Sequence, residues 1–211
     1  MENFRTYKIV TNRLILRCYE PQDVPAMSEG IMKSREHLGT FMPWAINDEH
    51  DTETVLKRIR KFRGLFDSGK DYIMGIFDKE SGAYLGGAGW HLRVGDHAAE
   101  IGYWVMVDHT QKGIATEAAR ALTKVGFEIE DLERIQIHTQ VQNEVSARIP
   151  ERLGYVKEAR LRKRITTTSG EAADIFVFSM LRDEYRGSEI AQMEVQAYDF
   201  IGRPLFVPFT P

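Results

Sequence analysis

The arrangement of the central strands and helix is set by the stretch Glu100-Ile-Gly-Tyr-Trp-Val-Met-Val-Asp-His-Thr-Gln-Lys-Gly-Ile-Ala-Thr-Glu117. Apart from the leading Glu, its first eight residues are apolar, aromatic or Gly, which predicts a buried strand over 100–107. A short polar loop follows, and from Ile114 to Leu132 apolar residues recur every three or four positions, which predicts an amphipathic helix of four to five turns. A strand over 135–141 comes next. The helix is therefore expected to be a right-handed crossover between two neighbouring parallel strands.

The segments on either side of this unit predict further strands and helices. Those before it are a strand over 13–18, helices over 22–33 and 51–66, and strands over 72–77 and 84–94. Asp51 and Thr52 are expected to cap the second of these helices. Short links between the last two strands and the strand over 100–107 imply an antiparallel meander. After the unit, Asn143 begins a short helix that ends at Gly154, and strands over 155–164 and 172–181 close the sheet. The fold class is α/β, with a mixed, mostly antiparallel central sheet flanked by helices.

Length and composition limit the class of protein. The chain has 211 residues, 43% of them hydrophobic and 28% charged, with a net charge of −3, as in a folded globular protein. No basic block is apparent among the 28 Lys and Arg residues, so nucleic acid is not expected as a partner. The single cysteine, Cys18, permits neither an intrachain disulfide nor a thiolate metal site, and no metal is expected. One cysteine fits a reducing cytosol best, so a cytoplasmic protein is expected. No apolar run approaches the ~20 residues of a membrane span, so neither membrane insertion nor export is expected.

The loop before the helix at Ile114 has the features of an anion site. The first amides of a helix have no partner within the helix, and they attract negative charge. Gly113 and Ala115 allow close approach to the backbone, which suits a pyrophosphate. On these residues alone, an ordinary glycine turn before a helix is the other interpretation.

This segment resembles the acetyl-CoA-binding motif of the GNAT acyltransferases, and a second segment follows at the expected distance. Residues 143–155 are similar to the family's Asn-x-x-Ser helix that ends in Leu-Gly-Tyr. Residues 11–23 and 37–44 are similar to the ribosomal-protein N-terminal branch of the family, the Rim type. The resemblance covers about residues 11–183. It implies a GNAT-type sheet that is splayed between the fourth and fifth expected strands, and acetyl-CoA as the cosubstrate.

The resemblance also implies which residues contact acetyl-CoA. The amides of Val105 and Val107 would face the pantetheine and thioester, while the loop and helix start would hold the pyrophosphate. The full implied set is Val105, Val107, Gln111, Lys112, Gly113, Ile114, Ala115, Thr116 and Asn143. Two positions depart from the family pattern. Thr110 stands where Gln or Arg is usual, and Pro150 stands where many members place a Tyr that protonates the leaving thiolate.

The implied reaction is direct attack of an amine on the thioester, so an incoming ammonium must first lose its proton. Glu100 is the candidate base, because an unpaired carboxylate on an otherwise apolar strand would have a raised pKa. Alternatively, Glu100 lies at an exposed strand start and pairs with a cation. Ser146 could donate a hydrogen bond to the departing thiolate, or only help to cap its helix. We assign no role to His109 or His138.

Residues 1–183 are expected to form the acetyltransferase domain, and residues 184–211 an extension. Ser188 could begin a helix in this extension, with an apolar stripe formed by Ile190, Met193, Ala197 and Phe200. An apolar run over 203–211 follows. The extension could pack on its own domain or on a second subunit, which would make a homo-oligomer.

The acceptor is expected to be a protein N-terminal amine. A small-molecule amine and a noncatalytic acyl-CoA-binding role are the alternatives.

Overall fold

One sheet of ten strands runs through the computed structural model, which describes residues 4–205. The strands are β1 (Lys8–Val10), β2 (Leu14–Cys18), β3 (Asp71–Asp78), β4 (Tyr84–His91), β5 (Ala98–Val105), β6 (Arg134–Gln140), β7 (Val156–Thr166), β8 (Ala172–Leu181), β9 (Gln196–Tyr198) and β10 (Pro204–Leu205). The helices are α1 (Val24–Lys33), α2 (Arg35–Gly39), α3 (Trp44–Asn47), α4 (Thr52–Asp67), α5 (Ile114–Glu128), α6 (Glu144–Arg152) and α7 (Arg182–Arg186). Three 3-10 turns are η1 (Pro21–Asp23), η2 (Val107–His109) and η3 (Glu189–Gln192).

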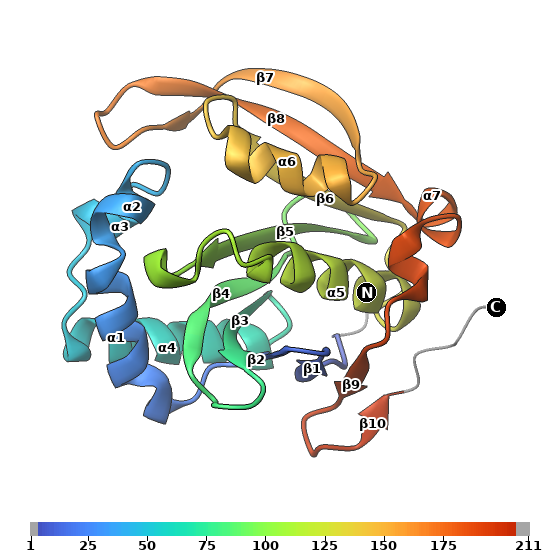
Figure 1. Cartoon of the computed structure of the whole chain (residues 1–211), viewed down its shortest axis with the longest axis horizontal. Helices are drawn as coiled ribbons and strands as arrows, with labels where there is room; N and C mark the ends of the chain where they lie inside the picture. Colours follow the sequence, from blue (N-terminus) through green and yellow to red (C-terminus); the bar gives the residue numbers. More distant parts are fainter. Residues whose placement is uncertain (1–3, 206–211) are drawn as a thin grey trace.

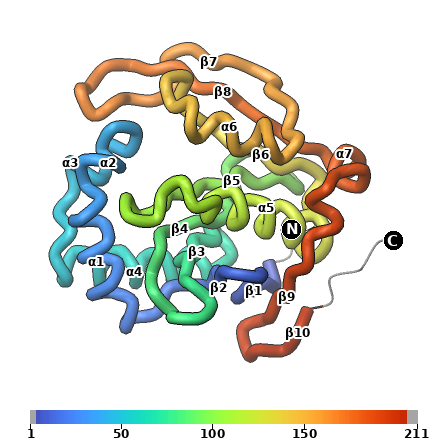
Figure 2. The backbone as a smooth tube through the Cα atoms, in the orientation of Figure 1, coloured from blue at the N-terminus to red at the C-terminus, as the bar shows by residue number. Residues whose placement is uncertain are grey.

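The strands are ordered β10-β9-β1-β2-β3-β4-β5-β6-β8-β7, and within this described sheet only β5 and β6 run parallel (Figure 1). β3, β4 and β5 form the expected meander. α5 leads from β5 to β6, as expected of a crossover (Figure 2). The predicted mixed α/β fold is therefore confirmed.

Helices cover both faces of this sheet. α5 and α6 share a core with the face that carries Trp90 and Ile101. α1 and α4 form a second cluster on the other face, in which Ile31 and Ile59 are fully buried. The start of α4 has the predicted cap, because the carboxylate of Asp51 accepts hydrogen bonds from the first-turn amides. The two clusters fix the sheet between two layers of helices.

The helix α5 follows its predicted stripe but ends one turn early. Ala118, Leu122 and Val125 are fully buried against the sheet. The helix stops at Glu128 instead of reaching Leu132, and Asp131 adopts a left-handed φ of 53°. That turn brings the chain back to the start of β6, so the last apolar residues of the stripe are buried without being helical.

The parallel pairing of β5 with β6 is short. Ala98–Glu100 pair with Arg134–Gln136, and the strands separate beyond that point although each continues for several residues. This is the predicted splay between the fourth and fifth expected strands. It opens on the side where β5 leads toward α5.

The predicted helix in the C-terminal extension is wrong. Ser188 starts only the short turn η3, after which β9 pairs with β1 and β10 pairs with β9. Ala197 is buried as a strand residue, whereas Phe200, assigned to the same stripe, is 68% exposed. The edge of β1 offers backbone partners at every second residue, and this long-range pairing overrides the local helical spacing.

The described part of the extension packs on its own domain. The ammonium of the buried Lys124 donates to the carbonyl of Ala191 at 2.7 Å, and Arg120 donates to the carbonyl of Glu189 at 2.6 Å. Both donors belong to α5. Residues 206–211 of the expected apolar run lie outside the described residues. Between residues 4 and 205 no helix is long and apolar enough to cross a membrane.

Deleting residues 187–211 should lower the melting temperature. The deletion removes the carbonyl partner of a buried ammonium, whose loss typically costs about 1–3 kcal/mol, and uncovers the edge of β1. With about 2–4 °C lost per kcal/mol in a chain of this size, we expect a fall of at least about 5 °C by differential scanning calorimetry. Light scattering should show an unchanged assembly. An unchanged melting temperature together with a smaller particle would instead place the extension in a subunit interface.

Candidate functional site

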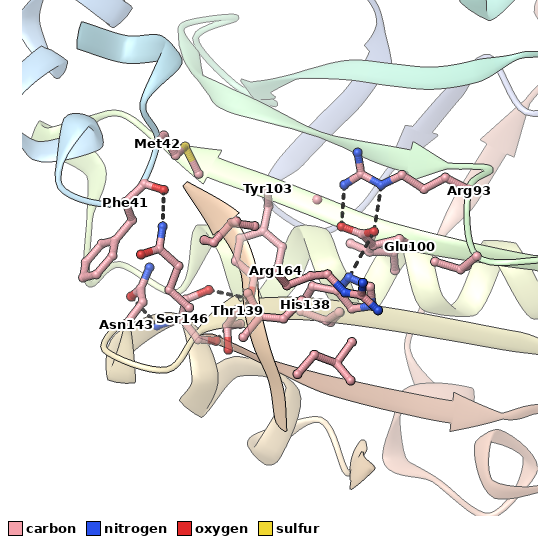
Figure 3. Close-up of a pocket in the computed structure, with 18 residues that line it drawn as sticks. Phe41, Met42, Arg93, Glu100, Tyr103, His138, Thr139, Asn143, Ser146 and Arg164 are labelled. Carbon is pink, nitrogen blue, oxygen red and sulfur yellow. Dashed lines mark hydrogen bonds and ion pairs between the residues drawn. The ribbon is translucent and has the colours of Figure 1, made fainter. Parts of the chain in front are cut away.

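A cavity of about 580 Å³ occupies the splay between β5 and β6 (Figure 3). Its walls come from β5, β6, β7, β8, the start of α6 and the loop between α2 and α3. That loop is tied to the walls by two side chains. Gln140 donates to the carbonyl of Phe41 at 2.7 Å, and the hydroxyl of Thr168, from the β7–β8 turn, donates to the carbonyl of Gly39. Segments about 130 residues apart in the chain therefore enclose one site.

Glu100 lines this cavity and is buried, not exposed at a strand start. Its carboxylate accepts two hydrogen bonds from Arg93, at 2.8 and 2.6 Å. Burial raises the pKa of Glu100, but the hydrogen bonds and charge of Arg93 and the charge of His138 lower it, and the net pKa lies below the ordinary value. The predicted rise in pKa is therefore wrong, because the turn between β4 and β5 places the guanidinium of Arg93 against the carboxylate. The alternative, in which Glu100 pairs with a cation at an exposed strand start, is correct about the ion pair. It is wrong about exposure, because Glu100 is buried.

His138, to which we assigned no role, lies beside Glu100 in the cavity. Its Nδ1 is 3.3 Å from Glu100 Oε2, and its Nε2 is 3.0 Å from Gln136 Oε1. Burial lowers the pKa of His138; Glu100 raises it, while Arg93 and Arg164 lower it further, and the net pKa is below the ordinary value. A neutral imidazole at pH 7 follows. The residue was missed because its contact with Glu100 crosses the parallel pair, 38 positions along the chain.

Tyr103 and Ser146 meet on another wall of the cavity. The phenol oxygen of Tyr103 is 3.3 Å from Ser146 Oγ and donates to the carbonyl of Ser146 at 3.2 Å. Burial raises the pKa of Tyr103 to about 12, partly offset by the hydrogen bond with Ser146, so the phenol stays protonated. This contact was not predicted, because Tyr103 belongs to an apolar strand and is part of no polar motif.

Asn143, placed among the cofactor residues by resemblance, is the cap of α6. Its side-chain oxygen accepts from the amide of Ser146 at 3.1 Å. The hydroxyl of Ser146 is therefore not the cap, and it is directed toward Tyr103 instead. The capping alternative for Ser146 is not what the structure shows.

The loop before α5 forms a second part of the site. Gln111 and Gly113 both have left-handed backbones, with φ of 59° and 77°, and Gly113 is the cap position of α5. The first bond within the helix runs from the amide of Glu117 to the carbonyl of Gly113. The earlier amides, those of Ile114, Ala115 and Thr116, are the open donors of the helix start.

Arg13 lies over this helix start and was not predicted to belong to it. Its guanidinium pairs with Glu117 at 2.6 Å and donates to the carbonyl of Lys112 at 3.1 Å. A Cβ added at Gly113 would lie 3.4 Å from Arg13 Nη2. The ammonium of Lys112 donates to the carbonyl of Asp108 within its own loop. Arg13 therefore supplies the cation next to the open amides.

The backbone amides of Val105 and Val107 are those predicted to face the pantetheine and thioester. Val105 is the last residue of β5, beyond the part paired with β6. The amide of Val107 already donates to the hydroxyl of Ser34 at 3.0 Å. A ligand at Val107 would have to replace that bond, whereas Val105 has no pairing partner on β6.

A basic block that the composition concealed lies on β7. Within residues 157–164 stand five cations, Lys157, Arg160, Arg162, Lys163 and Arg164, with Glu158 as the one acidic residue among them. All five are exposed. Arg164 also lines the cavity. The prediction that the chain has no basic block is therefore wrong, because the nearly balanced total charge hides a local excess of positive charge on β7.

Comparison with known proteins gives a consistent result. A family model described as an acetyltransferase (GNAT) domain matches residues 13–156. YdaF of Bacillus subtilis (strain 168), provisionally named a ribosomal N-acetyltransferase, is 30% identical over 184 residues, which cover 85% of this chain and 97% of YdaF. A GNAT-family acetyltransferase from Bacillus anthracis is 26% identical with a TM-score of 0.72, covering 84% of this chain and 99% of that one. Mycobacterium smegmatis RimJ, solved with a CoA disulfide, shares the fold at 23% identity and a TM-score of 0.73, covering 84% and 86% of the two chains.

The pair of Glu100 with Arg93 predicts a stability that depends on pH. A carboxyl whose pKa is lowered by folding stabilises the fold above its unfolded pKa, about 4.3, and this contribution is lost as the pH falls through the folded pKa. Glu100→Gln should therefore cost roughly 1 kcal/mol at pH 7, a value discounted because Arg93 is 63% exposed.

The difference between the two proteins should shrink as the pH falls below about 4.3 and through the lower folded pKa of Glu100. Urea unfolding at pH 7 and pH 3.5 measures it, with the exposed Glu80→Gln as the control that changes neither value. If Glu100→Gln lowers the free energy of unfolding as much at pH 3.5 as at pH 7, lost packing and not lost charge is responsible.

Proposed function

Because the chain belongs to the GNAT family, it is an acetyl-CoA-dependent N-acetyltransferase, and we propose that its acceptor is the N-terminal amine of a protein. The observation that carries the proposal is the cavity in the splay, which brings Glu100, His138 and Ser146 to one space. The similarity to YdaF over most of both chains supports a protein acceptor. A chain end can reach a recessed site of this kind, since only its first residues need to enter.

The residues of the helix start fit the pyrophosphate of acetyl-CoA. The left-handed Gly113 leaves room for a ligand that any side chain there would fill, with Arg13 nearby. Backbone donors and a guanidinium are the groups that bind phosphate oxygens well. We propose that the amides from Gln111 to Thr116 hold the pyrophosphate, and that the splay beside Val105 receives the pantetheine arm. Thr110, whose hydroxyl donates to the carbonyl of Val107, holds the loop instead of the ligand.

When bound, acetyl-CoA supplies an acyl thioester that an amine can attack directly. Ser146 is the proposed donor to the departing sulfur, since its hydroxyl faces the cavity and contacts the phenol of Tyr103. A thiol has an ordinary pKa of about 8.5, so a hydrogen bond is enough to stabilise the thiolate without full proton transfer. Tyr103 and Ser146 together replace the tyrosine that is missing at Pro150.

The proton of the amine is proposed to pass to the pair formed by Glu100 and His138. Both oxygens of Glu100 accept from Arg93, which makes the carboxylate alone a weak base. The neutral imidazole of His138 is in contact with it and is the stronger base of the two. Glu100 would then stabilise the imidazolium that forms, and the two residues would act as a unit.

Gly113→Glu should weaken acetyl-CoA binding more than tenfold. The substitution places a side chain and a negative charge where the pyrophosphate is proposed to lie, and strains a left-handed backbone. Gly202→Glu is the matched control, because Gly202 has a similar φ of 82° in an open turn between β9 and β10. Titration calorimetry measures both. Equal affinities of the two folded variants would refute this position for the cofactor.

Glu100→Gln and His138→Gln should each lower kcat/KM at pH 7 by on the order of 100-fold, the usual size of a lost general base. The loss should shrink above about pH 8, where a free α-amine is already deprotonated. The double variant should be no slower than either single one, because the two residues form one unit. Exposed His37→Gln is the control. A pH profile of the same shape in all variants would leave water as the proton acceptor.

The acceptor is tested with purified protein, acetyl-CoA and a panel of Ser- and Ala-starting peptides and polyamines, read by mass spectrometry. Acetylation of the α-amine of peptides is the expected result. Acetylation of polyamines alone would move the assignment to a small-molecule enzyme. No transfer to any amine, with acetyl-CoA still bound, would indicate a noncatalytic protein.

A further inference from the structure

Three neighbouring cations on β7, Arg162, Lys163 and Arg164, form what we call the basic triplet. The other two cations of this strand are paired, Lys157 with Glu151 at 3.0 Å and Arg160 with Asp174 at 2.9 Å. Among the described residues, no carboxylate lies within ion-pair distance of the side chains of the triplet. The triplet therefore presents three exposed positive charges without a carboxylate partner in the chain that is described.

The triplet lies at the rim of the cavity and is fixed there. The pairing of β7 with β8 shifts register between Leu161 and Ile165, and Lys163 has a left-handed φ of 50°. The amide of Lys163 donates to the carboxylate of Asp174 at 2.9 Å, which holds this irregular segment in place. Leu161, Arg164 and Ile165 line the cavity. One member of the triplet thus points into the site while its neighbours stand outside it.

The charge balance inside the cavity leaves Arg164 uncompensated. Glu100 is the one carboxylate among the described residues of the cavity wall, and it already accepts two hydrogen bonds from Arg93. Arg164 extends from β7 toward His138 (Figure 3), and among the described residues it forms no ion pair with a carboxylate. Such a site repels a plain ammonium ion and attracts an amine that brings a negative charge with it.

We propose that the acceptor is an N-terminal segment rich in Asp and Glu, bound by the basic triplet. The guanidinium of Arg164 takes the carboxylate closest to the reacting amine, as planar guanidinium and carboxylate groups match in geometry. Arg162 and Lys163 take carboxylates further along the segment, outside the cavity. This inference rests on the proposed function, because it assumes that a protein N-terminus enters the splay, and it adds the chemistry that selects the protein.

The test compares peptides that share their first residue and differ at positions two to five. One set carries Asp and Glu there, one carries Asn and Gln, and one carries Lys. For the wild-type protein with acetyl-CoA, kcat/KM should be at least about tenfold higher for the acidic than for the neutral set, mainly through KM. Fluorescence anisotropy with CoA present should show the same order of affinity. The preference should shrink as salt rises from 50 to 300 mM, as expected of exposed charge pairs.

Variants then assign the preference to the triplet. R162Q/K163Q/R164Q should bring the ratio of acidic to neutral peptides close to one. R60Q/K61Q/K70Q, which removes three exposed cations on and after α4, is the matched control and should keep the wild-type ratio. Melting curves show whether each variant is folded, and the wild-type peptide series gives an answer even if the triple variant is not.

Two results would overturn the proposal. One is equal kcat/KM and equal affinity of the wild-type protein for acidic and neutral peptides. The other is a labelled RNA hairpin that binds in a triplet-dependent manner while peptide charge has no effect, which would assign the triplet to nucleic acid. If no peptide is acetylated although the acidic set binds through the triplet, the proposed reaction fails and the acidic partner stands. If all peptides are acetylated equally, the reaction stands and the acidic partner fails.

Discussion

The separation of β5 from β6 is the constraint on which the site depends. The two strands pair only from Ala98 to Glu100, whereas each is held on its other side by a longer antiparallel ladder, with β4 and with β8. Because neighbouring strands of a sheet are rotated against each other, two long ladders that meet at a short parallel pair diverge beyond it. The divergence leaves backbone and side chains of both strands facing a cavity instead of each other. If the parallel pair continued to Val105, β5 and β6 would leave no such cavity between them.

The same strand also fixes where the two halves of the site lie. Glu100 lies at the paired end of β5 and Tyr103 in the diverging part, and the loop to α5 follows within a few residues. The loop is held from the opposite side by Arg13, which contacts both Glu117 and the carbonyl of Lys112. A run of 18 residues thus sets the spacing between a helix start with open amides and the cavity side chains of Glu100 and Tyr103. One short segment therefore places both parts of the site.

Local pattern predicted the parts of this molecule that local interactions decide. The meander, the crossover helix, the cap at Asp51 and the start of α6 at Asn143 follow from residues close together in the chain. Several failures involve contacts that no local pattern reports. The helical spacing after Ser188 lost to pairing with β1, and the pKa of Glu100 depended on a guanidinium from the preceding turn. The roles of His138 and Tyr103 depend on neighbours about 40 residues away, which no periodicity reports.

The cations of β7 have a second physical explanation, and it accounts for only part of what is seen. An edge strand with exposed charges resists pairing with another chain, and β7 is one edge of this sheet. The opposite edge, β10, is short and begins with Pro204, so it is protected without a cluster of charge. Edge protection would be served by cations spread along β7 and would tolerate their pairing with Glu151 and Asp174. It gives no reason for the cations without carboxylate partners to gather at the cavity end, or for Arg164 to point inward beside His138. Those two features concern what enters the cavity. They are explained if the site selects its acceptor by negative charge.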